Sequence, residues 1–139
     1  MKYMCMVYHD DKTLMDLSHS EHAEIVRECI AWIEELEHTG RHVFSSGLQS
    51  ARTATTVHTE NGKLVITDGP FAETREVLAG FTIIEARDLN DALAIVSRFP
   101  AARISKVEVR PLMQPDSVVT DPLDQKLVAV LKDVIGAHA

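Results

Sequence analysis

Two apolar runs constrain the fold most, because each carries hydrophobic side chains on both faces if it is extended. They read "YMCMVY" at residues 3–8 and "LAGFTIIEA" at residues 78–86. A strand exposed to water on one face alternates between apolar and polar residues, whereas a strand covered on both faces reads as a continuous apolar run. We therefore expect both runs to be central strands of a sheet that is covered on both faces.

A helix is expected between the first strand and the next. Ser18 and Glu21 have the spacing of a capping box, and Gly40 is suited to the position just after the helix. Apolar residues at steps of three and four predict the buried face, which comprises Val26, Cys29, Ile30, Ile33 and Leu36.

Further strands and a second helix complete the domain. A strand is expected at residues 42–49, a hairpin turning at Asn61-Gly62, and a closing half-buried strand in "KVEVRPL". Asp88 or Asn90 is suited to cap the second helix. The residues that this helix is expected to bury are Leu89, Leu93 and Val96.

The resulting order is strand, helix, strand, hairpin, strand, helix, strand. Without the hairpin it is β-α-β-β-α-β, the split βαβ or ferredoxin-like arrangement of an α+β fold. Two helices cover one face of such a sheet. The apolar residues on the other face predict a homodimer in which two sheets pack face to face.

The sequence pattern changes near residue 113, from that of a packed domain to that of a linker. We expect one domain at residues 1–113, and a linker with an extra C-terminal helix at 114–139. Asp121 is suited to cap this helix and Pro122 to begin it. Its expected apolar face, which must dock on its own domain or on a second copy, comprises Leu123, Leu127, Val130, Leu131 and Val134.

Charge and motifs exclude several function classes. The net charge is −7 and no basic cluster is present, which disfavours binding to nucleic acid or to an anionic membrane surface. No glycine-rich phosphate loop or Gly-x-Ser-x-Gly elbow occurs, so we expect no nucleotide cofactor. The opening apolar run is too short for a signal sequence or a membrane span, and Cys5 and Cys29 are expected to be core thiols. These features predict a cytoplasmic location.

The segment "TDGPFAETREVL" at residues 67–78 concentrates the unusual chemistry. One interpretation is a turn that fixes strand register, with Phe71 anchored in the core and a one-turn helix after it. The other is that the turn aims Asp68 into a cleft, where the carboxylate acts as a base. Both interpretations stay open from the sequence.

Proton transfer needs a partner for that carboxylate within hydrogen-bond reach. His22 and His19 near the start of the first helix, and His9 at the end of the first strand, are the candidates. The spacing of the histidines and cysteines is not that of a metal site, and we expect no metal.

The segment just described also resembles the signature of the DGPF family, within the YCII-related superfamily. "MKYMCMVY", "NGKLVITDGPF", "AGFTIIEARDLNDALAIVSRFPAAR" and "VEVRPLM" resemble that family too. The resemblance implies a dimeric α+β barrel, in agreement with the fold expected from the residues. For the family itself, it implies no established activity.

For function, the resemblance implies a pocket at the sheet edge that contains a His–Asp pair, and small cyclic compounds as ligands. We therefore expect a pocket for a small organic molecule with Asp68, His22 and His19 as catalytic residues. The expected binding residues are Tyr3, Tyr8, His9, Asp68, Gly69, Pro70, Phe71 and Glu73. The resemblance also implies an alternative, a noncatalytic regulatory module that associates with a sigma factor. Whether the protein is an enzyme stays open.

Overall fold

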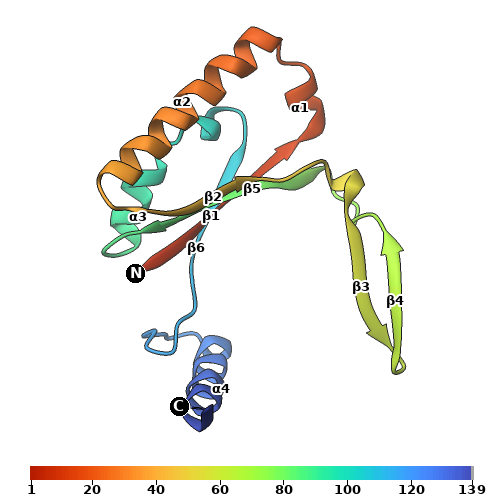
Figure 1. Ribbon diagram of the computed structural model, residues 1–139, viewed down its shortest axis with the longest axis vertical. Coiled ribbons are helices and arrows are strands. Elements are labelled where there is room, and N and C mark those ends of the chain that lie inside the picture. Colours follow the sequence, from red (N-terminus) through yellow and green to blue (C-terminus); the bar gives the residue numbers. More distant parts are fainter. Residues whose placement is uncertain (139) are drawn as a thin grey trace.

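The computed structural model describes residues 1–138, which form a mixed α+β fold (Figure 1). The described residues contain a four-stranded antiparallel sheet, a separate two-stranded hairpin and four α-helices. The elements in chain order are β1 (Lys2–Asp10), α1 (Asp11–Met15), α2 (His19–His38), β2 (His42–Gly47), the 3-10 turn η1 (Ala51–Thr53), β3 (Thr55–Glu60), β4 (Lys63–Asp68), β5 (Glu76–Glu85), α3 (Leu89–Val96), the 3-10 turn η2 (Pro100–Arg103), β6 (Lys106–Pro111) and α4 (Pro122–His138).

The main sheet has the strand order β2-β5-β1-β6, and every neighbouring pair is antiparallel. The two apolar runs therefore form the two central strands, β1 and β5, as predicted. Tyr3 lies opposite Ile84 and Cys5 opposite Thr82, and these four side chains point toward the helices. The helices α2 and α3 lie on this face of the sheet (Figure 1).

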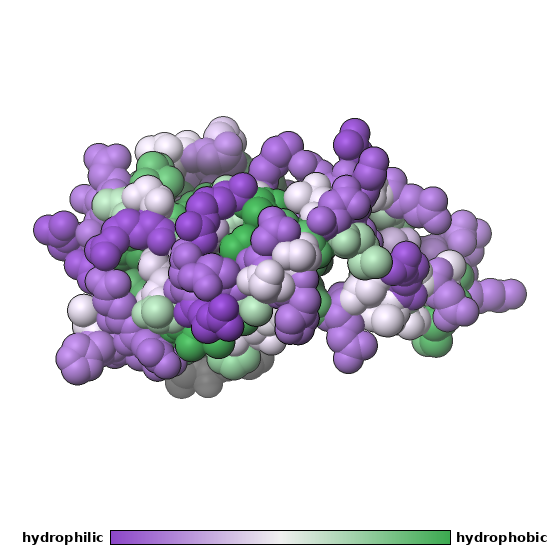
Figure 2. Space-filling model, turned by 90° about the horizontal axis from the view of Figure 1, so that it is seen from above, coloured by the Kyte–Doolittle hydropathy of each residue, from purple (hydrophilic) through white to green (hydrophobic). Residues whose placement is uncertain are grey.

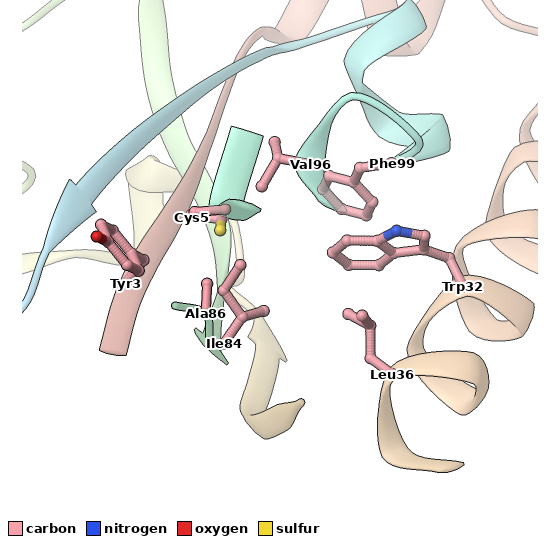
Figure 3. Close-up of a cluster of buried hydrophobic side chains, with 9 residues drawn as sticks. Tyr3, Cys5, Trp32, Leu36, Ile84, Ala86, Val96 and Phe99 are labelled. Atoms are coloured by element: carbon pink, nitrogen blue, oxygen red, sulfur yellow. The ribbon is translucent and has the colours of Figure 1, made fainter. Parts of the chain in front are cut away.

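The core lies between the sheet and these two helices (Figure 3). Cys5 and Ile84 of the sheet have no solvent exposure. On the helix side, the rings of Trp32 and Phe99 stack with their centroids 4.3 Å apart, and Trp32 Nε1 donates a hydrogen bond to the carbonyl of Ile95 (3.3 Å). This hydrogen bond satisfies the one polar atom of a large buried ring.

Helix α2 begins as predicted, with a reciprocal capping box between Ser18 and Glu21. Its predicted buried face is only half right. Trp32 and Leu36 are its buried residues, whereas Val26 and Ile30 are exposed, Ile30 by 51%. At 3.6 residues per turn, the side chain of Ile30 points about 120° away from that of Leu36. It therefore does not face the sheet. The face of the molecule seen from above shows hydrophobic patches among hydrophilic side chains (Figure 2).

Helix α3 is capped by Asp88, one of the two predicted caps, and buries Ala92 and Val96. The prediction that Leu89 and Leu93 are buried is wrong, because both side chains are about half exposed. The small side chain of Ala92 lies where α3 faces the sheet, and the i, i+4 pair that it forms with Val96 sets the buried stripe.

The hairpin of β3 and β4 stands apart from the main sheet (Figure 1). Its turn has positive φ at Asn61 (50°) and Gly62 (76°), the primed turn that the dipeptide predicted. One face of the hairpin exposes Val57, Leu64 and Ile66 to solvent. A lone hairpin is marginally stable in water, so this face is a surface that a further contact would stabilise.

Helix α4 is capped by Asp121, whose Oδ1 accepts hydrogen bonds from the backbone N–H groups of Leu123 and Asp124 (2.9 and 3.2 Å). Of its apolar residues, Val128 is buried and Leu131 is half-buried. The expected docking of the other apolar side chains is not seen within this chain, where Leu123, Leu127, Val130 and Val134 are exposed. Among the described residues, no helix combines the length and hydropathy needed to span a bilayer.

Candidate functional site

The corner at Asp68-Gly69 connects the hairpin to β5. Gly69 has φ of 94°, a conformation that side chains with a Cβ rarely adopt. Its N–H donates to the carbonyl of Ala54 (2.7 Å), and its own carbonyl accepts from Thr56 Oγ1 (2.8 Å). These two hydrogen bonds hold the corner against the start of β3.

Phe71 is 91% exposed, so the expectation that it anchors the corner in the core is wrong. The expected one-turn helix after it is also absent from the described residues, which run without helical structure from Phe71 to Arg75. The physical reason is the position of the corner. The corner lies between the hairpin and the main sheet, away from the helices that cover the core (Figure 1).

A cavity of about 590 Å³, which we call the loop cavity, lies beside this corner. Apolar side chains of the sheet end, chiefly Tyr8, Leu48 and Leu78, form much of its wall together with Phe71. The full set of lining residues is Tyr8, Leu48, Gln49, Ser50, Ala51, Thr53, Ala54, Pro70, Phe71, Ala72, Thr74, Glu76, Val77 and Leu78. Three of the predicted binding residues, Tyr8, Pro70 and Phe71, therefore meet at one cavity.

A β-bulge explains why Tyr8 and Leu78 share that wall. The register between β1 and β5 shifts after Val7, which lies opposite Gly80, so that Tyr8 lies opposite Leu78. The extra residue, Ala79, turns Leu78 to the face of the sheet that Tyr8 occupies. This bulge was not predicted from the sequence, although Gly80 beside it is a residue that often accompanies such irregularities.

A smaller cavity of about 220 Å³ adjoins the loop cavity and shares with it Leu48 to Ala51, Val77 and Leu78. His9 and Asp11 line this smaller cavity, with His9 Nε2 3.2 Å from Asp11 Oδ1. The His9 side chain is 15% exposed. His9 is one of the proton-transfer candidates predicted from the sequence, whereas Asp11 is not. The sequence "HDD" at residues 9–11, at the end of a predicted strand, could have indicated this His–Asp pair.

The other predicted site residues lie elsewhere. His19 is exposed and His22 half-buried in the first turn of α2, and Asp68 and Glu73 are exposed. Among the described residues, the Asp68 carboxylate has no hydrogen bond to a histidine. Tyr3 is buried in the core beneath the helices and does not line the loop cavity.

An ion pair ties the segment after the corner to the end of β1. Arg75 Nε donates to Asp10 Oδ2 (2.7 Å), and this hydrogen bond is the main reason that the pKa of Asp10 is lowered. The backbone N–H of Lys12 also donates to Asp10, which caps α1. Beside this pair, Lys106 Nζ lies 2.7 Å from Glu76 Oε1. These contacts hold one side of the loop cavity in place.

The side chains of the described residues form no cluster that could hold a metal ion. Within residues 1–138, no three histidine, cysteine, aspartate or glutamate side chains gather as a metal would require. Cys5 and Cys29 are free thiols, and burial raises the pKa of Cys5 to about 11. The side chains that line the loop cavity offer apolar contact and hydrogen bonding.

An antiparallel sheet under two helices, with a cavity at the end of β1 and β5, defines a small α+β domain. The chain belongs to the YCII-related domain family, whose family model matches residues 1–115. It is also 31% identical over 114 residues to an uncharacterized protein of Rhizobium meliloti (strain 1021), a match that spans 81% of this chain and 92% of that protein.

Proposed function

We propose that this protein binds a small organic molecule in the loop cavity. The observation that carries the proposal is Phe71, an aromatic ring 91% exposed at the rim of a cavity with Leu48 and Leu78 in its wall. Ligand sites are typically concave, mostly apolar and several hundred Å³ in volume. A planar ligand would cover the Phe71 ring and remove its apolar surface from water, which supplies binding free energy.

Acid–base catalysis is the activity we propose for a ligand long enough to pass Leu48 and Leu78 from the loop cavity into the adjoining cavity, where His9 would be the proton carrier. Histidine is the side chain most often used as a general acid or base, and Asp11 Oδ1, 3.2 Å from His9 Nε2, is placed to orient the ring. Lyases, isomerases and hydrolases all use such proton transfers. The pairing predicted from the sequence, Asp68 with His22 or His19, stays a prediction that requires contacts beyond those within one chain.

We further propose a ferredoxin-like domain that forms a homodimer through the face of the sheet away from the helices. The strand order β2-β5-β1-β6 is the one that a split βαβ arrangement has once the hairpin is set aside. The uncovered face carries the apolar side chains of Met4, Met6, Phe44, Phe81 and Ile83. A second copy would bury this face, and the segment "TDGPFAETREVL" supports placing the chain in the DGPF branch of its family.

A noncatalytic regulatory module is the second candidate, and the hairpin favours it. Val57, Leu64 and Ile66 form an exposed apolar surface on an element that projects from the domain (Figure 1). Such a surface fits a protein partner, for which the resemblance indicates a sigma factor. Loss of sigma-factor binding in Ile66→Asp, with binding kept in Val65→Asp on the opposite hairpin face, would favour this candidate.

The binding proposal is tested with catechol, a small cyclic probe, by calorimetric titration. Phe71→Ala should weaken binding at least about tenfold, because burial of a phenyl ring contributes roughly 1.5–3 kcal/mol. The control is Val118→Ala, which removes an exposed apolar side chain of the linker that does not line the cavity. Equal affinity of the Phe71→Ala variant and the natural protein would refute the role of Phe71.

Proton transfer is tested separately, so that a failure of catalysis leaves the binding proposal standing. His9→Gln should leave the affinity for the probe within about threefold, since the ring lines the adjoining cavity and not the loop cavity. It should abolish exchange of acidic C–H protons of a bound ketone with deuterium from water. Exchange at an unchanged rate in His9→Gln would remove His9 from the proposed chemistry.

A further inference from the structure

An irregularity in β2 brings two polar side chains to the same face. His42 lies opposite Ile84 and Phe44 lies opposite Ile83, so Val43 is an extra residue in β2. In a regular strand, residues 42 and 45 point to opposite faces. The bulge reverses this, so that both His42 and Ser45 point toward the helices, and bulges often re-aim a side chain in this way.

The two side chains form part of a hydrogen-bonded chain. His42 Nε2 lies 2.8 Å from Ser45 Oγ, and Ser45 Oγ donates to Thr82 Oγ1 at 3.0 Å. On the other side of the ring, His42 Nδ1 lies 3.8 Å from Glu37 Oε1 in the last turn of α2. Thr82 is 3% exposed and the His42 side chain 14%, so the chain passes into the apolar layer between α2 and the sheet.

These hydrogen-bonded side chains end at a third cavity, of about 360 Å³, which we call the interlayer cavity. Ser45 and Thr82 form its polar end, while Cys29 and Ile33 of α2, with Phe99, form apolar walls. A Ser–Thr hydrogen bond between paired strands is common and needs no ligand. The contact of the His42 imidazole with this Ser45–Thr82 pair, at the end of a cavity, is not needed for the pairing of β2 with β5.

We infer that the interlayer cavity binds a small neutral molecule that has an apolar body and a carbonyl or hydroxyl group. The apolar walls suit the body, and Ser45 supplies the hydrogen bond. When His42 Nε2–H donates to Ser45 Oγ, the serine hydroxyl is free to rotate from Thr82 to a ligand oxygen, and the bond it accepts strengthens the one it donates.

The charges around the cavity select against ionic ligands. No lysine or arginine is among the described residues that line it, so a carboxylate would lack a cation and would face Glu37 behind the histidine. No aspartate or glutamate lines it either, so a cationic ligand would be buried without a partner. Burial of an unpaired charge is strongly unfavourable.

The inference is tested by titration of the isotope-labelled protein with acetophenone and with ethylbenzene, which lacks only the carbonyl oxygen. Acetophenone should bind roughly three- to tenfold more tightly, the range that a single hydrogen bond of about 0.5–1.5 kcal/mol supplies. Amide shifts should centre on Cys29, Ser45 and Thr82. Equal affinity for the two probes, or shifts confined to the loop cavity, would overturn the inference.

Variants show whether Ser45 is the hydrogen-bonding group. Ser45→Ala should bring the ratio of the two affinities to about one and leave ethylbenzene binding unchanged. The control Ser97→Ala, at the exposed C-terminal end of α3, should keep the natural ratio. Cys29→Phe, which fills the cavity from its wall, should abolish binding of both probes. Phe71→Ala should leave the titration curves of the Cys29, Ser45 and Thr82 amides unchanged, which separates this site from the loop cavity.

Discussion

Phe44 and Phe81 lie side by side on the uncovered face of the sheet, with ring centroids 5.9 Å apart and their planes tilted by 40°. They belong to the edge strand β2 and the central strand β5, and Phe44 is 54% exposed. Phe81 is half-buried beside it. Aromatic side chains that cluster on an accessible face are frequent at interfaces between subunits.

The first prediction follows from this pair. Phe81→Asp should convert the proposed dimer into a monomer of 15.4 kDa, because the substitution places a carboxylate at the centre of the interface. Sedimentation equilibrium measures the mass. Phe71→Asp is the control, since it changes a more exposed ring away from the sheet face and should leave the mass unaltered. A natural protein that sediments as a monomer at all concentrations would contradict the dimer.

The second prediction concerns two glycines that lie opposite each other. A Cβ at Gly80 would lie 2.9 Å from the backbone oxygen of Ser46, whereas a Cβ at Gly47 would meet nothing within 4 Å. Gly80→Ala should therefore lower the free energy of unfolding by about 1–3 kcal/mol, the usual cost of overpacking. Gly47→Ala should change it by less than about 0.5 kcal/mol. Urea denaturation measures both, and equal effects would contradict the close approach of the strands.

The third prediction concerns the stacked rings of the core. Trp32→Ala should lower the free energy of unfolding by about 3–5 kcal/mol, because it removes the stacking on Phe99 and leaves a cavity between α2 and α3. Ile30→Ala on the same helix removes an exposed side chain and should have a small effect. Urea denaturation followed by circular dichroism compares them. Similar losses from the two variants would mean that α2 packs on a different face.

The fourth prediction concerns stability in acid. The backbone N–H and the side chain of Arg87, and then Arg41, donate hydrogen bonds to Asp91 and hold the pKa of its carboxyl group well below the ordinary value. A carboxyl group whose pKa is lower in the folded state stabilises the fold above its unfolded pKa of about 3.9, and this contribution is lost as the pH falls further.

The measurement is the free energy of unfolding as a function of pH. Below about pH 4 it should fall more steeply in the natural protein than in Asp91→Asn, which has no carboxyl group to protonate at this position. Asp116→Asn, in the exposed linker, is the control and should follow the natural curve. A curve for Asp91→Asn parallel to that of the natural protein would contradict the stabilising role of this ion pair.

The sequence predicted the elements that depend on local chemistry. The capping box of Ser18 and Glu21, the turn at Asn61-Gly62 and the cap at Asp121 all formed as expected, because each is decided by residues that are neighbours in the chain. The two central strands were predicted for a similar reason. Hydrophobic side chains on both faces of a strand indicate a covered sheet whatever lies on top of it.

Features that depend on tertiary contacts were not predicted. Trp32 rather than Ile30 lies in the core because of the way α2 is rotated about its axis against the sheet. Hydrophobic periodicity alone does not determine that rotation. The exposure of Phe71 depends on the direction in which the corner leads the chain. The two bulges, at Ala79 and Val43, reverse the alternation of the strands and bring together Tyr8 with Leu78 and His42 with Ser45.

The central claim is that a small organic molecule binds in the loop cavity against Phe71. The most direct measurement is the set of nuclear Overhauser contacts between the protons of bound catechol and those of the protein. The account predicts contacts to the rings of Phe71 and Tyr8 and to the methyl groups of Leu48 and Leu78. Contacts only to residues outside this wall, or an absence of contacts at saturating catechol, would contradict it.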